Sequence, residues 1–352
     1  MEYSIIMSNE IRLKAQSYFE KVRVGYKAGF LLSSNLNSLQ SQSMDFNDYL
    51  DALLNTKLPQ IFAESALVGD GSDWNLEELS ILGDISIGMP VKVFDNGLHT
   101  SPIVHDQPLE AVLVYTPGAL LRNDHGFTPA DYQDVTSDDG SIDSVKYNQL
   151  YARRLLPVFD YINEHAKKRG EVALITIPGL GSGQFAGKFH GQLEPYLKAA
   201  LKELLSNFSH SFDSIGVVYF DPYSVGENER TRIRNIEFLV RPFKKGNEGK
   251  AQLSLPANLS DKAKEFKDCS LYSIVAWDHV SWPGNDFWVG ARVTDDGVKA
   301  SATDSMYKMT EVRGEYDIST NKYMPPKQYS NWAEVISKNK LRIFVKDNVL
   351  VY

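Results

Sequence analysis

Short apolar runs alternate with amphipathic segments over most of this 352-residue chain, and this alternation restricts the fold more than any other feature. A short apolar run bounded by turn residues predicts a strand buried on both faces, whereas apolar residues at helical spacing predict a covering helix. We therefore predict an α/β fold, with a largely parallel sheet covered by helices on both faces. The predicted strands are 111–115, 172–177, 215–220, 236–240, 271–276 and 341–345, and the main predicted helices lie around 150–162 and 190–208.

The first 100 residues have a different pattern. Segments 11–30 and 46–62 carry apolar residues at helical spacing, and a loop rich in Ser, Asn and Gln, 33–43, lies between them. We predict an N-terminal helical extension over residues 1–100, followed by an α/β domain over residues 101–352.

Composition excludes several classes of function. The net charge is −8, so the chain lacks the basic field that binding nucleic acid requires. With the single cysteine Cys269 and scattered histidines, no disulfide and no metal site is expected. No run reaches the ~18 apolar residues of a membrane span, so we expect a soluble protein that does not bind membranes.

A glycine-rich loop follows the predicted strand 172–177. Gly179, Gly181, Gly183 and Gly187 lie within nine residues. Glycines allow the backbone N–H groups to approach a phosphate at the carboxyl end of a strand, which favours a diphosphate ligand. The residue spacing does not fit a Walker A loop, a dinucleotide-binding fingerprint or a nucleophile elbow. A plain glycine-rich turn stays open as an alternative.

A second segment, 271–297, combines three tryptophans with acidic residues. Asp278, Asp286 and Asp296 lie on or beside the turn Pro283-Gly284-Asn285. Aromatic rings beside carboxylates can raise a carboxyl pKa, and cleavage of a glycosidic bond uses carboxylates to stabilise positive charge and to activate water. From spacing alone, a surface loop with solvated acids and core tryptophans is the favoured interpretation.

The glycine-rich loop resembles the second ligand loop of macrodomains. In that family a strand ending in Pro leads to a Ser/Thr-Gly-x-aromatic turn and then to a helix, and Ser182, Gly183, Gln184 and Phe185 match that turn. The resemblance implies a three-layer α/β/α fold. It also implies that backbone groups of 181–184 wrap the diphosphate of ADP-ribose and that Phe185 lines the distal ribose.

The aspartate segment resembles the catalytic side of macrodomains that hydrolyse ADP-ribosyl-arginine. Asp278, Asp286 and Asp296 lie where that type carries its functional aspartates. The chain departs from the usual pattern in lacking a clear Asn-Ala-Ala-Asn segment, and its acidic loop follows the phosphate loop instead of preceding it. Both departures leave the individual roles of the aspartates open.

The resemblance implies a hydrolase that removes ADP-ribose from arginine side chains, with ADP-ribosylated ubiquitin as one substrate and with no cofactor. Asp286 and Asp296 would orient the ribose and the guanidinium and polarise water, and Asp278 would position the ligand or a neighbouring acid. Asn285 and Tyr223 would help to bind the ligand. The resemblance is to a bacterial effector, which would be secreted into the host cytoplasm without a cleaved signal peptide. The alternative is a non-catalytic reader that binds ADP-ribose without turnover.

Overall fold

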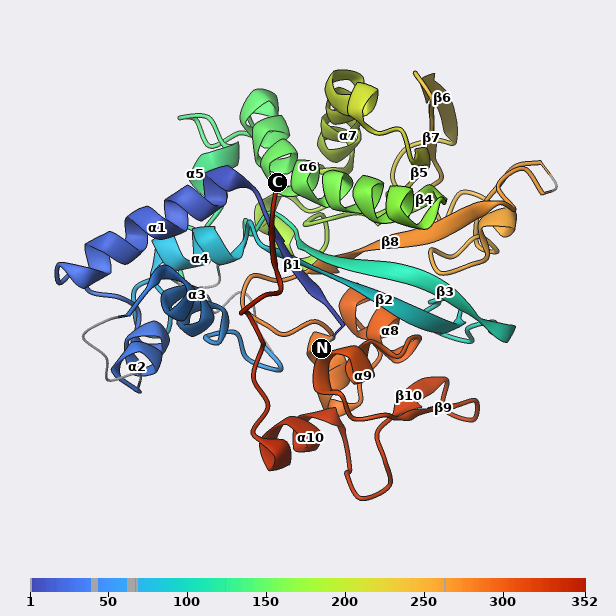
Figure 1. Ribbon diagram of the computed structural model, residues 1–352. Helices are drawn as coiled ribbons and strands as arrows, with labels where there is room; N and C mark the ends of the chain where they lie inside the picture. The colour runs from blue at the N-terminus through green and yellow to red at the C-terminus, as the bar shows by residue number, and fades with distance from the viewer. Residues whose placement is uncertain (1, 39–43, 62–66, 68, 124, 263) are drawn as a thin grey trace.

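The computed structural model describes residues 2–38, 44–61, 67, 69–123, 125–262 and 264–352. Within these residues a nine-stranded mixed sheet lies between helices on both faces, which confirms the predicted α/β/α layers (Figure 1). The order of its strands is β11-β1-β2-β3-β8-β4-β5-β7-β6, and β9 pairs with β10 separately. The strands are β1 Ser4–Met7, β2 Ser86–Asp95, β3 Val104–Pro117, β4 Val172–Pro178, β5 Ile215–Asp221, β6 Glu229–Ile233, β7 Ile236–Val240, β8 Cys269–Trp277, β9 Glu315–Asp317, β10 Lys322–Met324 and β11 Val349–Val351.

The five central strands are parallel. β3 pairs with β8, β8 with β4, β4 with β5 and β5 with β7, all in the same direction. β2 and β6 flank this group as antiparallel neighbours, and β1 pairs antiparallel with β2 and parallel with β11. The carboxyl ends of the five central strands therefore meet at one edge of the sheet, where ligands bind in open α/β folds.

Successive side chains of the central strands enter two different cores. On β4, Ile175 packs into the core under α6 and α7, whereas Leu174 faces the core on the opposite side of the sheet. That opposite core also receives the helices of the N-terminal and C-terminal regions (Figure 1). The helices are α1 Asn9–Arg23, α2 Phe30–Ser38, α3 Phe46–Leu54, α4 Leu76–Leu82, α5 Tyr132–Val135, α6 Ser144–Arg169, α7 Glu194–Phe208, α8 Asp295–Ser301, α9 Ser305–Thr310 and α10 Trp332–Asn339.

The N-terminal region supplies both helices and strands. Helices α1 to α4 lie in this region, with α1 ending at Arg23, before the predicted end at residue 30, while β1 and β2 of the same region belong to the main sheet. Helix α3 begins at an Asp45 capping box and ends at Leu54, earlier than predicted, and Phe62 lies outside the described residues. Residues 33–38, predicted as loop, belong to α2, and 39–43 lie outside the described residues. The division at residue 100 into two domains stays a prediction.

The predicted strand 341–345 is wrong. Ile343 and Val345 are buried, but the segment is irregular. The Asn55 side chain both accepts a hydrogen bond from the Ile343 N–H and donates one to its C=O, each at 3.0 Å. Because Asn55 takes the place of a neighbouring strand, the apolar run fills the core without joining the sheet. The last strand, β11, begins later, at Val349.

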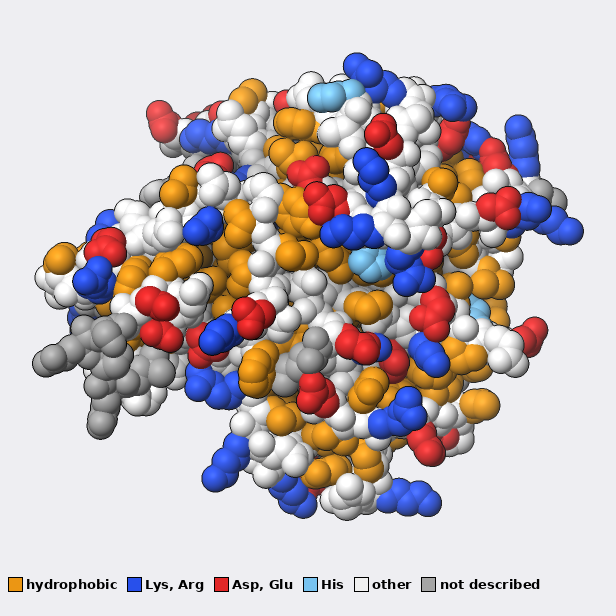
Figure 2. All heavy atoms as spheres, viewed as in Figure 1, with side chains coloured by type: hydrophobic (Ala, Val, Ile, Leu, Met, Phe, Trp, Pro, Cys, Tyr) orange, Lys and Arg blue, Asp and Glu red, His pale blue; other side chains and the backbone are white. Residues whose placement is uncertain are grey.

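Acidic and basic side chains are interspersed over the face of the molecule drawn in Figure 2, and no continuous basic field lies on that face. None of the helices among the described residues has both the length and the apolar character needed to cross a membrane.

Candidate functional site

Two neighbouring strands carry the two loops that the sequence singles out. The glycine-rich loop, residues 179–187, follows β4, and the aspartate loop, residues 278–297, follows β8 and extends into α8. Because β4 and β8 are paired in parallel, both loops leave the same edge of the sheet. The loop after β3, residues 118–131, leaves that edge beside β8. The structure therefore groups the predicted segments at the position where α/β folds bind ligands.

The glycine-rich loop is held against the loop after β3. Gly181 has a φ of +70°, and a Cβ there would lie 2.6 Å from the Ala119 nitrogen, so this position requires glycine. The Tyr151 hydroxyl, from α6, donates to Leu180 O at 2.6 Å. Ser182 is buried and donates through Oγ to Gly179 O at 2.9 Å. These contacts fix the backbone of the loop before any ligand binds.

A pocket of about 640 Å³ opens on the outer side of this loop. Gly183 and Gln184 line it, and a Cβ on Gly183 would meet no atom within 4 Å, so its backbone is accessible. Arg122 and Lys188 bring positive charge to the lining. The other lining residues are Leu121, Asn123, Gly126, Phe127, Thr128, Pro129, Tyr132, Gly187 and His190. An accessible glycine backbone beside two cations and aromatic rings suits an anionic ligand with an aromatic or sugar part.

Lys188 and Arg122 are both anchored in this pocket. Lys188 Nζ donates to the Tyr132 hydroxyl at 2.8 Å and lies 5.0 Å from the centroid of that ring. Arg122 Nη1 donates to Gln184 Oε1 at 2.7 Å. The cations are thus positioned by neighbouring polar groups and do not extend freely into water. The three predicted catalytic aspartates, all of them described residues, are not part of the lining.

Asp278 is buried and serves its own loop. Its Oδ1 accepts hydrogen bonds from the backbone N–H groups of Val280, at 2.7 Å, and Ser281, at 2.5 Å. Its Oδ2 accepts from the Ser281 hydroxyl and from Asn285 Nδ2. Both oxygens of the Asp278 carboxylate therefore accept hydrogen bonds from the turn 280–285. Asp278 thus fixes the shape of this part of the site.

Asp296, on the first turn of α8, is also buried, and only one of its oxygens is paired. Oδ1 accepts from Gly284 N at 2.5 Å, whereas Oδ2 is buried without a hydrogen-bond partner. Burial raises the pKa of Asp296 well above its ordinary value, and the negative charge of Asp278 raises it further. Asp296 therefore differs from the solvated acid that spacing alone favoured.

Asp286 is only partly buried and caps the segment that leads into α8. Its Oδ2 accepts from Val293 N at 2.8 Å, and its Oδ1 accepts from the Thr294 hydroxyl. A Cβ on Gly297 would lie 1.8 Å from Oδ1, so the helix start and the carboxylate are in close contact. Asn285 is buried, and its Oδ1 accepts from Ile61 N at 2.8 Å. The aspartate loop thus contacts the N-terminal region directly.

Lys57 is a member of this cluster that sequence reasoning missed. It is 2% exposed, and its Nζ donates to His279 O at 2.5 Å and lies 4.0 Å from the centroid of the Trp277 ring. Burial lowers the pKa of Lys57 to about 7, against the opposing effect of the Asp278 and Asp296 carboxylates. A single lysine more than 200 residues away in sequence has no local pattern that would have identified it.

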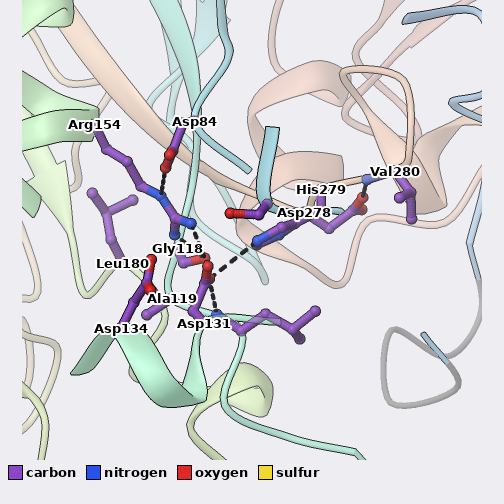
Figure 3. Close-up of polar contacts among 12 residues, drawn as sticks. Asp84, Gly118, Ala119, Asp131, Asp134, Arg154, Leu180, Asp278, His279 and Val280 are labelled. Carbon is purple, nitrogen blue, oxygen red and sulfur yellow. Dashed lines mark hydrogen bonds and ion pairs between the residues drawn. The ribbon is translucent and has the colours of Figure 1, made fainter. Parts of the chain in front are cut away.

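A second feature absent from the prediction is a buried chain of charged groups that joins the loops (Figure 3). Arg154, from α6, donates to Asp84 Oδ1 at 2.7 Å and to Asp131 Oδ1 at 2.8 Å. His279 Nε2 lies 3.1 Å from Asp131 Oδ2. Burial alone would raise the pKa of Asp131, but Arg154 and His279 outweigh it and lower that pKa. Asp131 is fully buried, whereas Asp138 and Asp139, in the same acidic segment, are exposed.

The remaining predicted ligand residues lie in two places. Phe185 is partly buried, with its ring 6.4 Å from that of His279 between centroids, so it connects the glycine-rich loop with the aspartate loop. Tyr223 follows β5 and is 56% exposed, and its ring stacks on Phe243. Tyr223 N also donates to Asp221 Oδ1 at 2.8 Å, and Tyr223 O accepts from Lys244 N at 2.8 Å, so Tyr223 packs against the segment after β7.

Comparison with known families identifies the group to which this arrangement belongs. The family model described as "Macrodomain effector MavL" matches residues 3–329. The chain belongs to the MavL macrodomain effector family. Macrodomains bind ADP-ribose or remove it from modified groups, so membership of this family supports a function of that type.

A curated relative matches a much shorter part of the chain. A multidomain esterase from Ruminococcus flavefaciens is 33% identical over 72 residues, which are 20% of this chain and 9% of the esterase. Because the match spans so little of either protein, it does not identify the activity of this chain.

Proposed function

We propose that this macrodomain hydrolyses the bond between ADP-ribose and an arginine side chain of a modified protein. The observation that carries the proposal is the pairing of β4 with β8, since it brings a preformed glycine-rich loop and a cluster of three aspartates to one edge of the sheet. Family membership supports ADP-ribose as the ligand.

The glycine-rich loop supplies the binding half of the proposed reaction. The accessible backbone at Gly183 and the cations Arg122 and Lys188 suit a diphosphate. The rings of Tyr132 and Phe127, in the same pocket, provide an apolar wall for a base or a sugar. Phe185 lies between this pocket and the aspartate loop, which is the position expected for a side chain beside the distal ribose.

The aspartate loop supplies the chemical half. Cleavage of the N-glycosidic bond develops positive charge on the ribose, and carboxylates stabilise that charge. A guanidinium is a leaving group that carboxylates bind well. Asp286 and Asp296 are assigned to orient the ribose and guanidinium and to polarise water. Asp278, whose oxygens hold the turn 278–285, is assigned to position them.

A non-catalytic ADP-ribose reader is the second candidate. It is favoured by one observation, namely that the carboxylates are bound mainly by amides of their own loop and that the pocket of about 640 Å³ is lined without them. A reader would need the glycine-rich loop and would tolerate loss of the acids.

One experiment separates the two candidates. The full chain is incubated with arginine-linked, glutamate-linked and serine-linked ADP-ribosyl proteins, including ubiquitin modified on arginine, and free ADP-ribose is quantified by chromatography. Release from the arginine linkage alone supports the proposal. Binding of ADP-ribose, measured by calorimetry, without release from any linkage supports the reader. Ubiquitin is the protein substrate suggested by the effector resemblance, and a matched arginine-modified peptide tests whether the enzyme requires it.

A further inference from the structure

The N-terminal segment 57–61 is paired along the aspartate loop. Leu58 N donates to Val280 O at 2.8 Å, and Trp282 N donates to Leu58 O at 2.7 Å, so Leu58 forms a parallel bridge with Ser281. Trp282 Nε1 also donates to Lys57 O at 3.1 Å. This pairing fixes the backbone at residue 57 and directs the Lys57 side chain into the interior beside Trp277.

The ammonium of Lys57 has fewer hydrogen-bond acceptors around it than it has N–H donors. It carries three N–H donors, and among the described residues it donates to one oxygen, His279 O, while the Trp277 ring offers its π face. The charges that act on it most are those of Asp278 and Asp296. A buried ammonium with so few acceptors is stable only if nearby negative charge compensates its desolvation.

The Asp296 carboxyl group, in turn, has fewer hydrogen-bond donors around it than it has acceptor positions. Its Oδ2 is buried and accepts no hydrogen bond from the described residues. A buried carboxylate with a free oxygen is costly as an anion and favours the protonated form unless a cation lies close to it. Lys57 is a cation that the N-terminal segment buries beside the turn that Asp278 holds, and its charge acts on Asp296 as well.

We propose that Lys57 is a positioning residue of the candidate active site, which acts through Asp296 by favouring the ionised form of that carboxyl group. This inference rests on the proposed function. Lys57 and Asp296 together hold the same number of protons as an ammonium and a carboxylate or as an amine and a carboxylic acid. A proton moving from Asp296 to Lys57 therefore ionises Asp296 without any exchange of protons with the solvent. A ligand guanidinium or developing positive charge would select the ionised acid.

The direction of the pH effect follows from the surrounding charges. Asp296 faces the like charges of Asp278, Asp286 and Asp295, all of which raise its pKa. The buried cations Lys57 and Lys299 both oppose them, and Lys299 Nζ also donates to Asp295 Oδ2 at 3.0 Å. Tyr115 also faces Asp296, and burial raises its pKa well above the ordinary value, so it stays neutral. Without Lys57, ionisation of Asp296 should require a higher pH.

The test removes the charge of Lys57 and keeps a donor to His279 O. In Lys57→Gln, the acidic limb of the pH profile of kcat/KM for an ADP-ribosyl-arginine substrate should move up by roughly one pH unit or more. Lys57→Arg, which restores a cation, should place that limb at or below its wild-type pH. Lys27→Met, an exposed lysine of the same region, is the matched control and should leave it unchanged. A merely structural role would lower the melting temperature without moving the limb.

A spectroscopic measurement makes the test independent of catalysis. In protein labelled with ¹³C-lysine, one lysine signal, absent in Lys57→Gln, should titrate with a midpoint near 7 instead of the ordinary 10.5. Titration of that signal near 10.5, or an unmoved pH limb in folded Lys57→Gln, overturns the inference. If the wild type releases ADP-ribose from no linkage, the proposed function fails. The same pH comparison is then made on ADP-ribose affinity, and an unmoved profile there overturns the role of Lys57 as well.

Discussion

The glycine-rich loop and the aspartate loop leave the same edge of the sheet but are built in opposite ways. The glycine-rich loop is open, since Gly183 meets no neighbouring atom at its Cβ position and a pocket lies beside it. The aspartate loop is closed, since Asp278 and Asp296 are each 3% exposed and bind amides of their own turn. The glycine-rich loop is accessible to a ligand, whereas the aspartate loop holds ionisable groups in the interior.

The difference shows how two loops at one edge of a sheet can divide ligand binding and bond cleavage between them. Backbone amides bind a diphosphate without titrating, so the open loop can face water. Carboxylates that must stabilise positive charge act more strongly away from water, which favours a closed loop. The buried chain Asp84–Arg154–Asp131–His279 connects the two loops. Asp131 contacts His279 of the aspartate loop and also accepts a hydrogen bond from Leu120 N, beside the glycine-rich loop.

The largest expected effect comes from breaking that connection. Arg154→Met would leave the buried Asp84 with Arg153 alone and the buried Asp131 with His279 alone, which should cost about 3 kcal/mol or more of unfolding free energy. Urea unfolding followed by fluorescence measures this cost. Arg23→Met, at an exposed ion pair with Glu20, is the control and should change stability by less than about 1 kcal/mol. Equal stability losses in the two variants would show that the buried chain does not hold the loops together.

The next effect should be confined to the closed loop. Asp286→Asn and Asp296→Asn keep side-chain size but remove negative charge, so turnover of ADP-ribosyl-arginine should fall by roughly 10²-fold or more. ADP-ribose affinity, measured by calorimetry, should fall far less. Asp138→Asn, in an exposed loop, should behave as the wild type. Normal turnover in both site variants would remove the aspartates from the proposed chemistry.

A smaller effect should be confined to the open loop. Gly183→Val adds a side chain where the structure has space, so the fold should be kept while ligand approach is blocked, with a loss of roughly tenfold or more in ADP-ribose affinity. Gly181→Val is the contrasting variant. It should destabilise the fold by about 1–3 kcal/mol, because φ there is +70° and the Ala119 backbone is too close. Unchanged affinity in folded Gly183→Val would place the diphosphate elsewhere.

The sequence predicted the parts of the fold that have strong local patterns. Strands β4, β5, β7 and β8 and the second half of β3, residues 111–117, are largely buried on both faces and therefore appear as continuous apolar runs. β6, with the sequence Glu-Arg-Thr-Arg-Ile at the sheet edge, has no such run, and β1 is only four residues long. These strands are defined by their partners, which local sequence does not reveal.

The same distinction applies to the site. The glycine-rich and aspartate loops were predicted because their unusual residues are close in sequence, and the structure places them on neighbouring strands. Lys57, Asp131 and His279 were missed because their roles come from contacts between distant segments. Charge burial is a property of the folded chain, and a single lysine or histidine in a sequence does not report it.

The pairing of Leu58 with the aspartate loop also has a consequence for the order of folding. Trp282 and Lys57, which share a hydrogen bond, are 225 residues apart, so the chain must close a very long loop before the acids reach their final environment. On a ribosome, the N-terminal helices would be made long before the loop that they complete. Until that loop arrives, Lys57 would remain hydrated and charged with its ordinary affinity for protons. Closing the loop would then bury that ammonium against the Trp277 ring, so a kinetic experiment could detect completion of the site as a late change in tryptophan fluorescence during refolding.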